Sequence, residues 1–244
     1  MDINNNKSDY GVWKFLAWCG PACLVIFLGS WGILAQNFPP VGADLSPLEI
    51  AAHYRNNNMA LVTGLSIAIL AWGFYYAWGA AIAQVIRRVD GPDSILANLE
   101  AMGATITAVC PLIACAIWVT IAVEASILAP ETIHAMYFMG WVFIDMTYIV
   151  TSFQLLAVSI AFLRDSRERP LIPAWACWWG FFTCVSWFPL SLISFFKTGP
   201  FAFHGLFNFW VAFGTYFSWS CLMSIFIIKA VSRLQREEAA LVAQ

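Results

Sequence analysis

The order of apolar and polar residues divides the chain into six long apolar segments separated by short polar stretches. A helix needs about 20 mainly apolar residues to span the hydrocarbon core of a membrane, and each segment reaches that length. None shows the strict alternation over about 10 residues that marks a membrane-spanning β-strand. The pattern therefore predicts an all-α fold, a polytopic membrane bundle forming one domain over residues 1–244. The six predicted transmembrane helices are 15–36, 59–86, 102–128, 133–163, 171–196 and 201–230.

The polar stretch between the first two spans carries a signal for the start of a short helix. Ser46 suits the N-cap position, Pro47 follows at the first helical position, and Glu49 stands where a capping box requires an acidic residue. Apolar residues at helical spacing follow. The sequence therefore predicts a short amphipathic helix over 47–56 on the outer surface of the membrane.

The positions of lysine and arginine predict the orientation. Ten of the twelve basic residues lie on one side of the predicted bundle, and the other side has only Arg55 and Lys197. Cytoplasmic loops carry the excess of positive charge, so both termini are expected in the cytoplasm. The first span is too long, and preceded by too many acidic residues, for a cleaved signal peptide. We expect a multi-pass protein of the cell inner (plasma) membrane.

Composition narrows the class of protein further. Of the 244 residues, 61% are hydrophobic and 11% are charged, with a net charge of −2. A soluble domain has about 25% charged residues, so this chain has too few to cover a surface in water. A cytosolic enzyme, a disordered tail and a nucleic-acid partner are excluded. All seven cysteines fall within predicted spans, where we interpret them as packing residues rather than disulfides.

Three stretches resemble a known family. They are AAHYRNNN entering the second span, IAQVIRRVDGP leaving it, and FPLSLISFFKTGPFAFHGLFNFW between the last two spans. The most specific pieces are YRNN at 54–57 and FKTGPFA at 196–202. Together they resemble a family of uncharacterised bacterial six-helix integral membrane proteins, over most of the chain. The resemblance implies the six-helix fold and importance for Arg55 and Lys197, but it implies no activity.

Polar side chains within the spans are the first candidates for a site, because ionisable groups there are costly and usually functional. Asp145 falls near the middle of the fourth span, and Glu124 near the outer end of the third. Asn208 lies near the outer start of the sixth span. For Asp145 the alternative is a structural hydrogen bond to a neighbouring helix, and for Glu124 it is solvation at the interface. The residues that we considered as partners of Asp145 are Tyr75, Tyr76 and Thr183.

Basic groups are expected at the outer mouth of such a pocket. Arg55, Lys197 and His204 all fall on the outer side, where Arg55 and Lys197 are suited to hold a carboxylate, sulfate or phosphate. The alternatives are ion pairs with nearby glutamates and contacts with lipid headgroups. The predicted pocket opens outward between the third, fourth and sixth spans. Its predicted ligand-binding residues are Asp145, Glu124, Asn208, Arg55, Lys197 and His204.

The histidines raise a second possibility, a metal site. His53, His134 and His204 are all predicted on the outer side, and with Glu131 they would suit zinc, copper or iron. The spacing is non-local and contains no HxxxH motif, so the alternative is ordinary surface histidines. No histidine lies deep in a span, which argues against haem, and the sequence identifies no cofactor.

Aromatic and small residues suggest how the bundle packs. Thirteen tryptophans and twenty phenylalanines include several deep in the spans, which would suit a flat apolar ligand such as a sterol, quinone or carotenoid. The alternative is packing of the bundle or contact with lipid. The third span is rich in small residues and is predicted to be the central helix. Pro111 and Pro189 are predicted to kink their helices.

Three functions remain open. No catalytic motif such as GxSxG, a P-loop, a dinucleotide fingerprint or HExxH is present, so an enzyme is not the leading expectation. The leading hypothesis is a membrane protein that binds, or binds and transports, a small hydrophobic or amphipathic molecule in an outward-facing pocket, with membrane lipid around it. The alternatives are an accessory or self-assembling subunit of a membrane complex, including a homo-oligomer, and a metal-dependent intramembrane enzyme acting on a lipid-like substrate.

Overall fold

The computed structural model describes residues 9–243, and this part of the chain is helical with no β-strand. Several helices pass directly into a tighter or wider helical turn, labelled η. The elements are α1 (Tyr10–Phe27), the π-helical turn η2 (Leu28–Leu34), α2 (Pro47–Asn56), α3 (Asn58–Asp90), α4 (Ile95–Glu124), α5 (Pro130–Asp145), α6 (Tyr148–Leu163), α7 (Ala174–Ser186), the 3₁₀ turn η3 (Phe188–Leu192), the π-helical turn η4 (Leu206–Val211) and α8 (Ala212–Val242).

Five segments are long and apolar enough to cross a membrane, and they correspond to five of the six predicted spans. The exception is the predicted span 171–196. Its α-helix, α7, has 13 residues and is therefore about 20 Å long, short of the roughly 30 Å of a hydrocarbon core. The five segments are Tyr10–Leu34, Asn58–Asp90, Ile95–Glu124, Pro130–Leu163 and Leu206–Val242.

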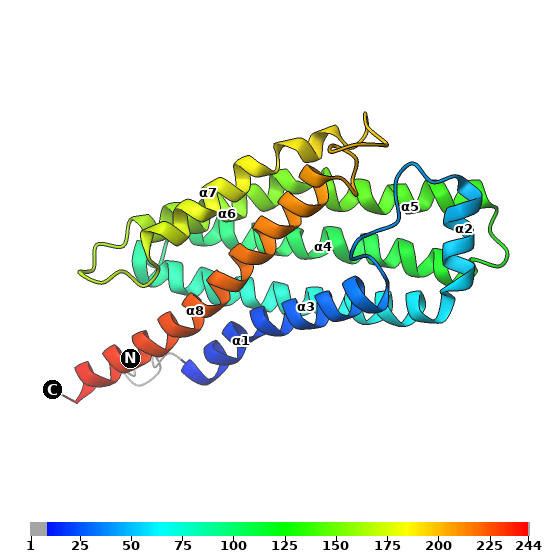
Figure 1. Ribbon diagram of the computed structural model, residues 1–244. Helices are drawn as coiled ribbons and strands as arrows, with labels where there is room; N and C mark the ends of the chain where they lie inside the picture. The colour runs from blue at the N-terminus through cyan, green and yellow to red at the C-terminus, as the bar shows by residue number, and fades with distance from the viewer. Residues whose placement is uncertain (1–8, 244) are drawn as a thin grey trace.

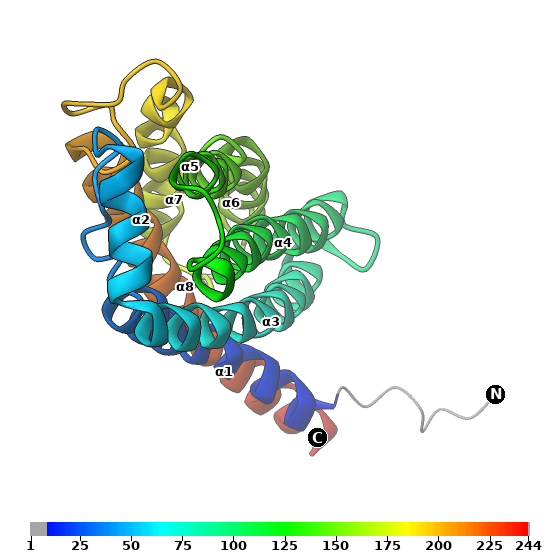
Figure 2. The same cartoon turned by 90° about the vertical axis from the view of Figure 1, so that its right-hand side faces the viewer.

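The long helices form a closed ring. Going round it, α1 packs on α3, α3 on α4, α4 on α6, α6 on α7, α7 on α8, and α8 returns to α1. Figure 1 shows the beginning of α1 and the end of α8 at one end of the bundle, and α2 across the opposite end. Figure 2 shows the ring from the α2 end. The helix predicted to be central, α4, is instead one member of this ring, and α3 packs against more of the other helices, namely α1, α2, α4, α6 and α8.

The predicted helix at 47–56 is present as α2. Ser46 accepts a hydrogen bond from the Glu49 backbone, and the Glu49 carboxylate accepts one from the Ser46 backbone, which completes the capping box. Ile50, Ala51 and Tyr54 are buried against the bundle, chiefly against α5. This helix therefore closes one end of the ring.

The opposite end is held by ion pairs between segments far apart in the sequence. Arg88 near the end of α3 lies 3.2 Å from the Glu238 carboxylate of α8, and Arg164 lies 3.4 Å from Asp90. The Tyr10 hydroxyl donates to the same Glu238 carboxylate over 2.6 Å. These contacts fix the start of α1 beside the last turns of α8.

Candidate functional site

A cavity of about 80 Å³ lies in the middle of the ring. Side chains from α1, α3, α4, the α5–α6 junction, the α7–η3 junction and α8 line it. These include the elements between which the sequence predicted a pocket, namely the third, fourth and sixth spans. The cavity lies at mid-depth rather than at the end of the bundle covered by α2.

Four segments end or change helix type where they line this cavity, and a fifth, α4, contains a proline there. Phe27 is the last α-helical residue before η2, and Asp145 is the last residue of α5. Trp187 joins α7 to η3, Ala212 follows η4, and Pro111 interrupts the hydrogen-bond ladder of α4. All five residues line the cavity, and α3 and α4 continue through this depth as α-helices. Breaks and π-helical turns of this kind gather at functional sites in membrane helices.

Asp145 is the one acidic or basic residue among the described residues that line the cavity. It is 1% exposed, and neither carboxylate oxygen has a hydrogen-bond partner among residues 9–243. Because Asp145 ends α5, the negative end of that helix dipole adds to the field of the carboxylate. A buried carboxylate without a partner is strongly unfavourable, so a proton or a positively charged group beside it would lower its free energy.

The predicted structural partners of Asp145 make other contacts. The Tyr75 hydroxyl donates to Gln154 Oε1 over 3.0 Å, and Thr183 donates to the Trp179 carbonyl over 2.9 Å. Tyr76 is 57% exposed. The alternative of a structural bond to one of these residues is therefore wrong.

Among the hydroxyl groups of the cavity wall, that of Tyr216 has no hydrogen-bond partner in the described part of the chain, whereas the other four are engaged elsewhere. Each of these four has a hydrogen-bond partner at 2.6–2.9 Å, so none of them is obliged to turn toward the carboxylate. The pairs are Thr107 with Thr151, Thr147 with the Phe143 carbonyl, and Tyr148 with Ser191.

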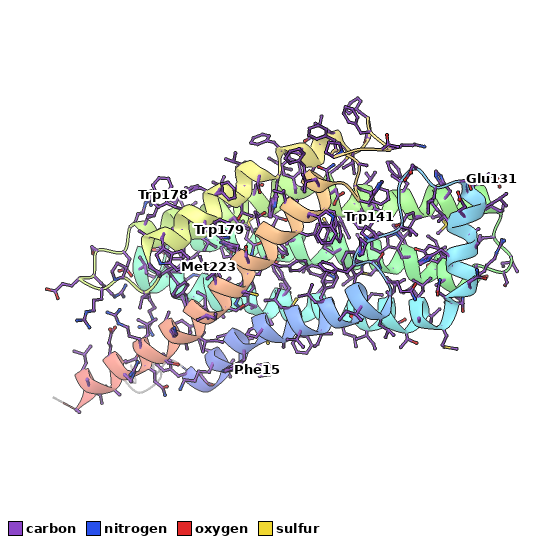
Figure 3. The ribbon with its side chains drawn as sticks, in the orientation of Figure 1. Phe15, Glu131, Trp141, Trp178, Trp179 and Met223 are labelled. Carbon is purple, nitrogen blue, oxygen red and sulfur yellow. The ribbon has the colours of Figure 1, made fainter. Side chains whose placement is uncertain are left out.

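The route from the cavity to the α2 end is filled by aromatic rings. Trp141 lies one turn before Asp145 and stacks on Phe203, with ring centroids 4.7 Å apart and planes at 6°. Trp31 stacks on Phe213 at 5.7 Å and 5°, and Trp118 packs against Trp141 at 5.3 Å. Figure 3 shows Trp141 inside the bundle. These deep aromatic residues pack against one another, as the alternative interpretation proposed, and they close the expected outward mouth.

Two of the predicted polar contacts lie outside the cavity. Glu124 ends α4, thirteen residues beyond Pro111 and therefore about 20 Å along the helix. Asn208 is fully buried in η4, where its Nδ2 donates to the Phe201 carbonyl over 2.5 Å. Neither side chain lines the cavity with Asp145.

The residues predicted at the mouth do not line the cavity, and Arg55 instead bonds to a loop at the α2 end of the bundle. Arg55 donates from Nε to the Ala125 carbonyl (2.8 Å) and from Nη2 to the Leu128 carbonyl (3.0 Å). It therefore joins α2 to the α4–α5 loop, and it forms no ion pair with a glutamate of residues 9–243. Lys197 is exposed in the loop before η4.

His204 also ties two loops together. Its Nδ1 accepts from the Ala43 backbone N–H over 3.0 Å, and its Nε2 lies 3.8 Å from Asp44 Oδ1. These contacts join the segment before α2 to the segment before η4. His204 does not line the cavity.

The proposed metal ligands are not brought together. Within residues 9–243, no three His, Cys, Asp or Glu side chains are grouped closely enough to hold a metal ion. His53 is half-buried on α2 beside an open groove, and this burial lowers its pKa. His134 is half-buried on α5, and Glu131 is exposed in the first turn of that helix, at the α2 end (Figure 3).

A second buried carboxyl, Glu100, was missed by the sequence reasoning, which placed it in a loop. Glu100 lies in the second turn of α4 and is fully buried. Gln154 Nε2 on α6 donates to its Oε1 over 3.1 Å, and Tyr75 on α3 donates to the same Gln154 side chain. Glu100 Oε2 has no partner in the described part of the chain.

A signal for Glu100 was present in the sequence. Gly103, Ala104 and Thr107 follow it at helical spacings of three, four and seven residues, so all four share one face of α4. Small residues on one face mark the side that packs closely against other helices. A glutamate in phase with that face is therefore expected inside the bundle.

Comparison with protein-family models, curated proteins and solved structures finds no match to this chain. The resemblance to a bacterial six-helix family therefore remains a prediction, and the site has to be interpreted from its own chemistry.

Proposed function

We propose that the chain crosses the plasma membrane six times, with the end that carries Tyr10 and Glu238 in the cytoplasm. Because those two residues are hydrogen-bonded, the first and last crossings share one end, which requires an even number of crossings. The segment formed by α7 and η3 connects the two ends of the bundle and supplies the crossing beyond the five long apolar segments. The excess of arginine at this end supports its cytoplasmic location.

We infer that the protein binds a small amphipathic molecule in the cavity beside Asp145. The observation that supports this most is a fully buried carboxylate, without a hydrogen-bond partner among the described residues, in the wall of a cavity where α5 ends and α6 follows. Side chains with this cost persist in membrane proteins where they serve a ligand, an ion or a proton. The surrounding wall is aromatic and apolar, which suits the remainder of an amphipathic molecule.

The entry route that we propose is lateral. Aromatic packing between the cavity and the α2 end leaves no direct outward mouth. The lining residues Cys110, Thr147 and Thr151 are half-buried on the flanks of α4 and α6. A molecule dissolved in the membrane would reach Asp145 between these helices.

The size of the cavity limits what it encloses. Pockets for drug-sized ligands have volumes of about 300–1,000 Å³. A cavity of about 80 Å³ is suited to a head group or a single ring, not to the fused skeleton of a sterol or the length of a carotenoid. The apolar remainder of the ligand would lie against the flank of the bundle.

Two matched variants on α4 test this function. Cys110→Phe places a ring in the cavity, whereas Val109→Phe places the same ring on the exposed face of the same turn. Protein purified in a mild non-ionic detergent would be analysed by native mass spectrometry for bound small molecules. Wild type and Val109→Phe are expected to retain a bound molecule that Cys110→Phe has lost. Equal retention by all three proteins, or no bound molecule on wild type, would contradict the proposal.

A further inference from the structure

The charge of the cavity wall identifies the class of ligand. Asp145 is the one acidic residue among the described residues that line the cavity, and no lysine, arginine or histidine accompanies it. With both carboxylate oxygens unpartnered and α5 ending at the same residue, the local field is negative. Without a positive group beside it, the carboxyl group avoids the cost of a buried charge by holding a proton, and a cationic head group would take the place of that proton, which a neutral or anionic head group would not.

Nothing in the neighbouring protein provides the missing positive charge. The three threonine hydroxyls of the wall and the Tyr148 hydroxyl are bonded to other groups at 2.6–2.9 Å, and the Tyr216 hydroxyl, which has no partner among the described residues, carries no positive charge. The basic end of the bundle uses its arginines in ion pairs and in bonds to backbone carbonyls, as Arg167 does with Asp165 at 2.8 Å and with the Arg88 carbonyl. The compensating group must therefore come from outside the described chain.

The remainder of the wall favours an organic cation over a metal ion. Aromatic rings from four helices face the cavity and contact one another: Phe27 and Trp72 at 4.8 Å, Trp187 and Tyr216 at 5.8 Å, and Tyr216 and Phe217 at 5.5 Å. Ring faces attract alkylammonium groups and exclude ions that need a complete shell of oxygen ligands. Trp187 is held in place because its indole N–H donates to the Ala212 carbonyl over 3.1 Å.

We propose that the cavity binds a monovalent organic cation, an amine or quaternary ammonium group with an apolar substituent, whose charge pairs with Asp145 within the aromatic wall. This inference rests on the proposed function and specifies its ligand. The cation lies at the negative end of α5, and its apolar part extends between α4 and α6 toward the lipid.

The test compares two ligands of the same shape. Benzyltrimethylammonium carries a permanent positive charge, and neopentylbenzene is its uncharged carbon isostere. Binding of each would be measured by equilibrium dialysis of the purified full-length protein in nanodiscs of zwitterionic lipid. Wild type is expected to bind the cation about tenfold or more tightly than the isostere, because ion pairing and cation–π contact act only on the charged form.

Four variants separate this inference from the proposed function. Asp145→Asn should lose about tenfold or more of the affinity for the cation and keep its affinity for the isostere, whereas Asp145→Glu should keep most of both. Cys110→Phe should lose both ligands, and Val109→Phe should lose neither. Suppose that Cys110→Phe weakens the binding of both ligands, but that wild type and Asp145→Asn each bind the cation and its isostere with equal affinity. The cation inference then fails and the proposed function stands. If Cys110→Phe has no effect, both fail.

Two controls exclude other interpretations. Should Asp145→Asn not fold, the preference of wild type for the cation over its isostere decides the question alone. Replacing the chloride salt of N-methylglucamine, a hydrophilic cation without an apolar substituent, by sodium chloride in the dialysis buffer should leave binding of benzyltrimethylammonium unchanged. Strong competition by sodium would assign the site to an inorganic ion and overturn the proposal.

Discussion

Gln154 on α6 donates from Nε2 to Glu100 Oε1 on α4 over 3.1 Å, in a part of the bundle where both side chains are fully buried. The Gln154 Oε1 in turn accepts from the Tyr75 hydroxyl on α3 over 3.0 Å. One amide therefore links three helices, and its loss would leave polar groups on both neighbours without partners.

This linkage predicts unequal effects of two substitutions. Gln154→Leu removes both hydrogen bonds and should lower the free energy of unfolding by about 1–3 kcal/mol, because two buried groups lose their partners. Glu100→Gln keeps an oxygen that accepts from Gln154, so the change should stay below about 1 kcal/mol. Reversible unfolding in mixed detergent–SDS micelles, followed by tryptophan fluorescence, measures both. A loss for Glu100→Gln as large as that for Gln154→Leu would show that the carboxyl has a role beyond this bond.

The close contact of α3 with α4 predicts opposite effects at two glycines of the same helix. A Cβ at Gly79 would clash with Ala104, whereas a Cβ at Gly73 would meet nothing within 4 Å. Gly79→Ala should therefore destabilise the protein by about 1–3 kcal/mol through overpacking. Gly73→Ala should stabilise it by a few tenths to about 1 kcal/mol, since alanine favours a helix. The unfolding midpoints of the two variants, compared with wild type, test this prediction. A shift in the same direction for both variants would contradict the packing described.

The bonds of Arg55 predict a structural role. Arg55→Met removes both bonds to the carbonyls of the α4–α5 loop and should cost about 1–3 kcal/mol of stability. Lys197→Met serves as the control, because Lys197 is exposed. Thermal unfolding in detergent compares the two variants. If Lys197→Met were the more harmful, the exposed loop before η4 would have a role that its contacts do not show.

The half-buried His53 predicts a pH dependence of stability. Burial lowers its pKa from the ordinary value of 6.5, so the unfolded chain binds the proton more readily than the folded protein. The stability that neutral His53 contributes is present above about pH 6.5 and is lost as the pH falls through the lower folded pKa. The unfolding temperature of wild type should therefore fall between about pH 7 and about pH 5, and fall less in His53→Gln. Leu48→Gln, at an exposed position of α2, should keep the wild-type slope, and equal slopes for all three proteins would contradict the assignment.

Hydrophobic length and helix signals were sufficient to predict most of the architecture. The capping box at Ser46 and Glu49 fixed the position of α2, and five predicted spans match helices of sufficient length. The remaining span was harder, because its residues form the short helix α7 followed by a 3₁₀ turn at Phe188–Leu192. Hydropathy measures how apolar a segment is and contains no information about where its helix ends.

The sequence predicted only part of the candidate site, because it indicates how deep a residue lies and not which way its side chain points. Asp145 stood out because a carboxylate in the middle of a span is rare, and the structure places it in the cavity wall. Glu124, Asn208 and His204 were grouped with it by their predicted depth, which fixes position along the bundle but not direction around a helix. Arg55 illustrates the same limit, because its partners are carbonyl oxygens, and every residue type carries one.

The ends and irregular turns of four segments beside the cavity have a mechanical consequence. A continuous α-helix resists bending because each turn is bonded to the next, and that resistance is weakest where the bonds are rearranged or missing. At the level of the cavity, α3 and α4 continue as α-helices, although Pro111 removes one backbone hydrogen bond from α4. We therefore expect the bundle to bend most easily at this level, and a molecule held beside Asp145 to resist that bending.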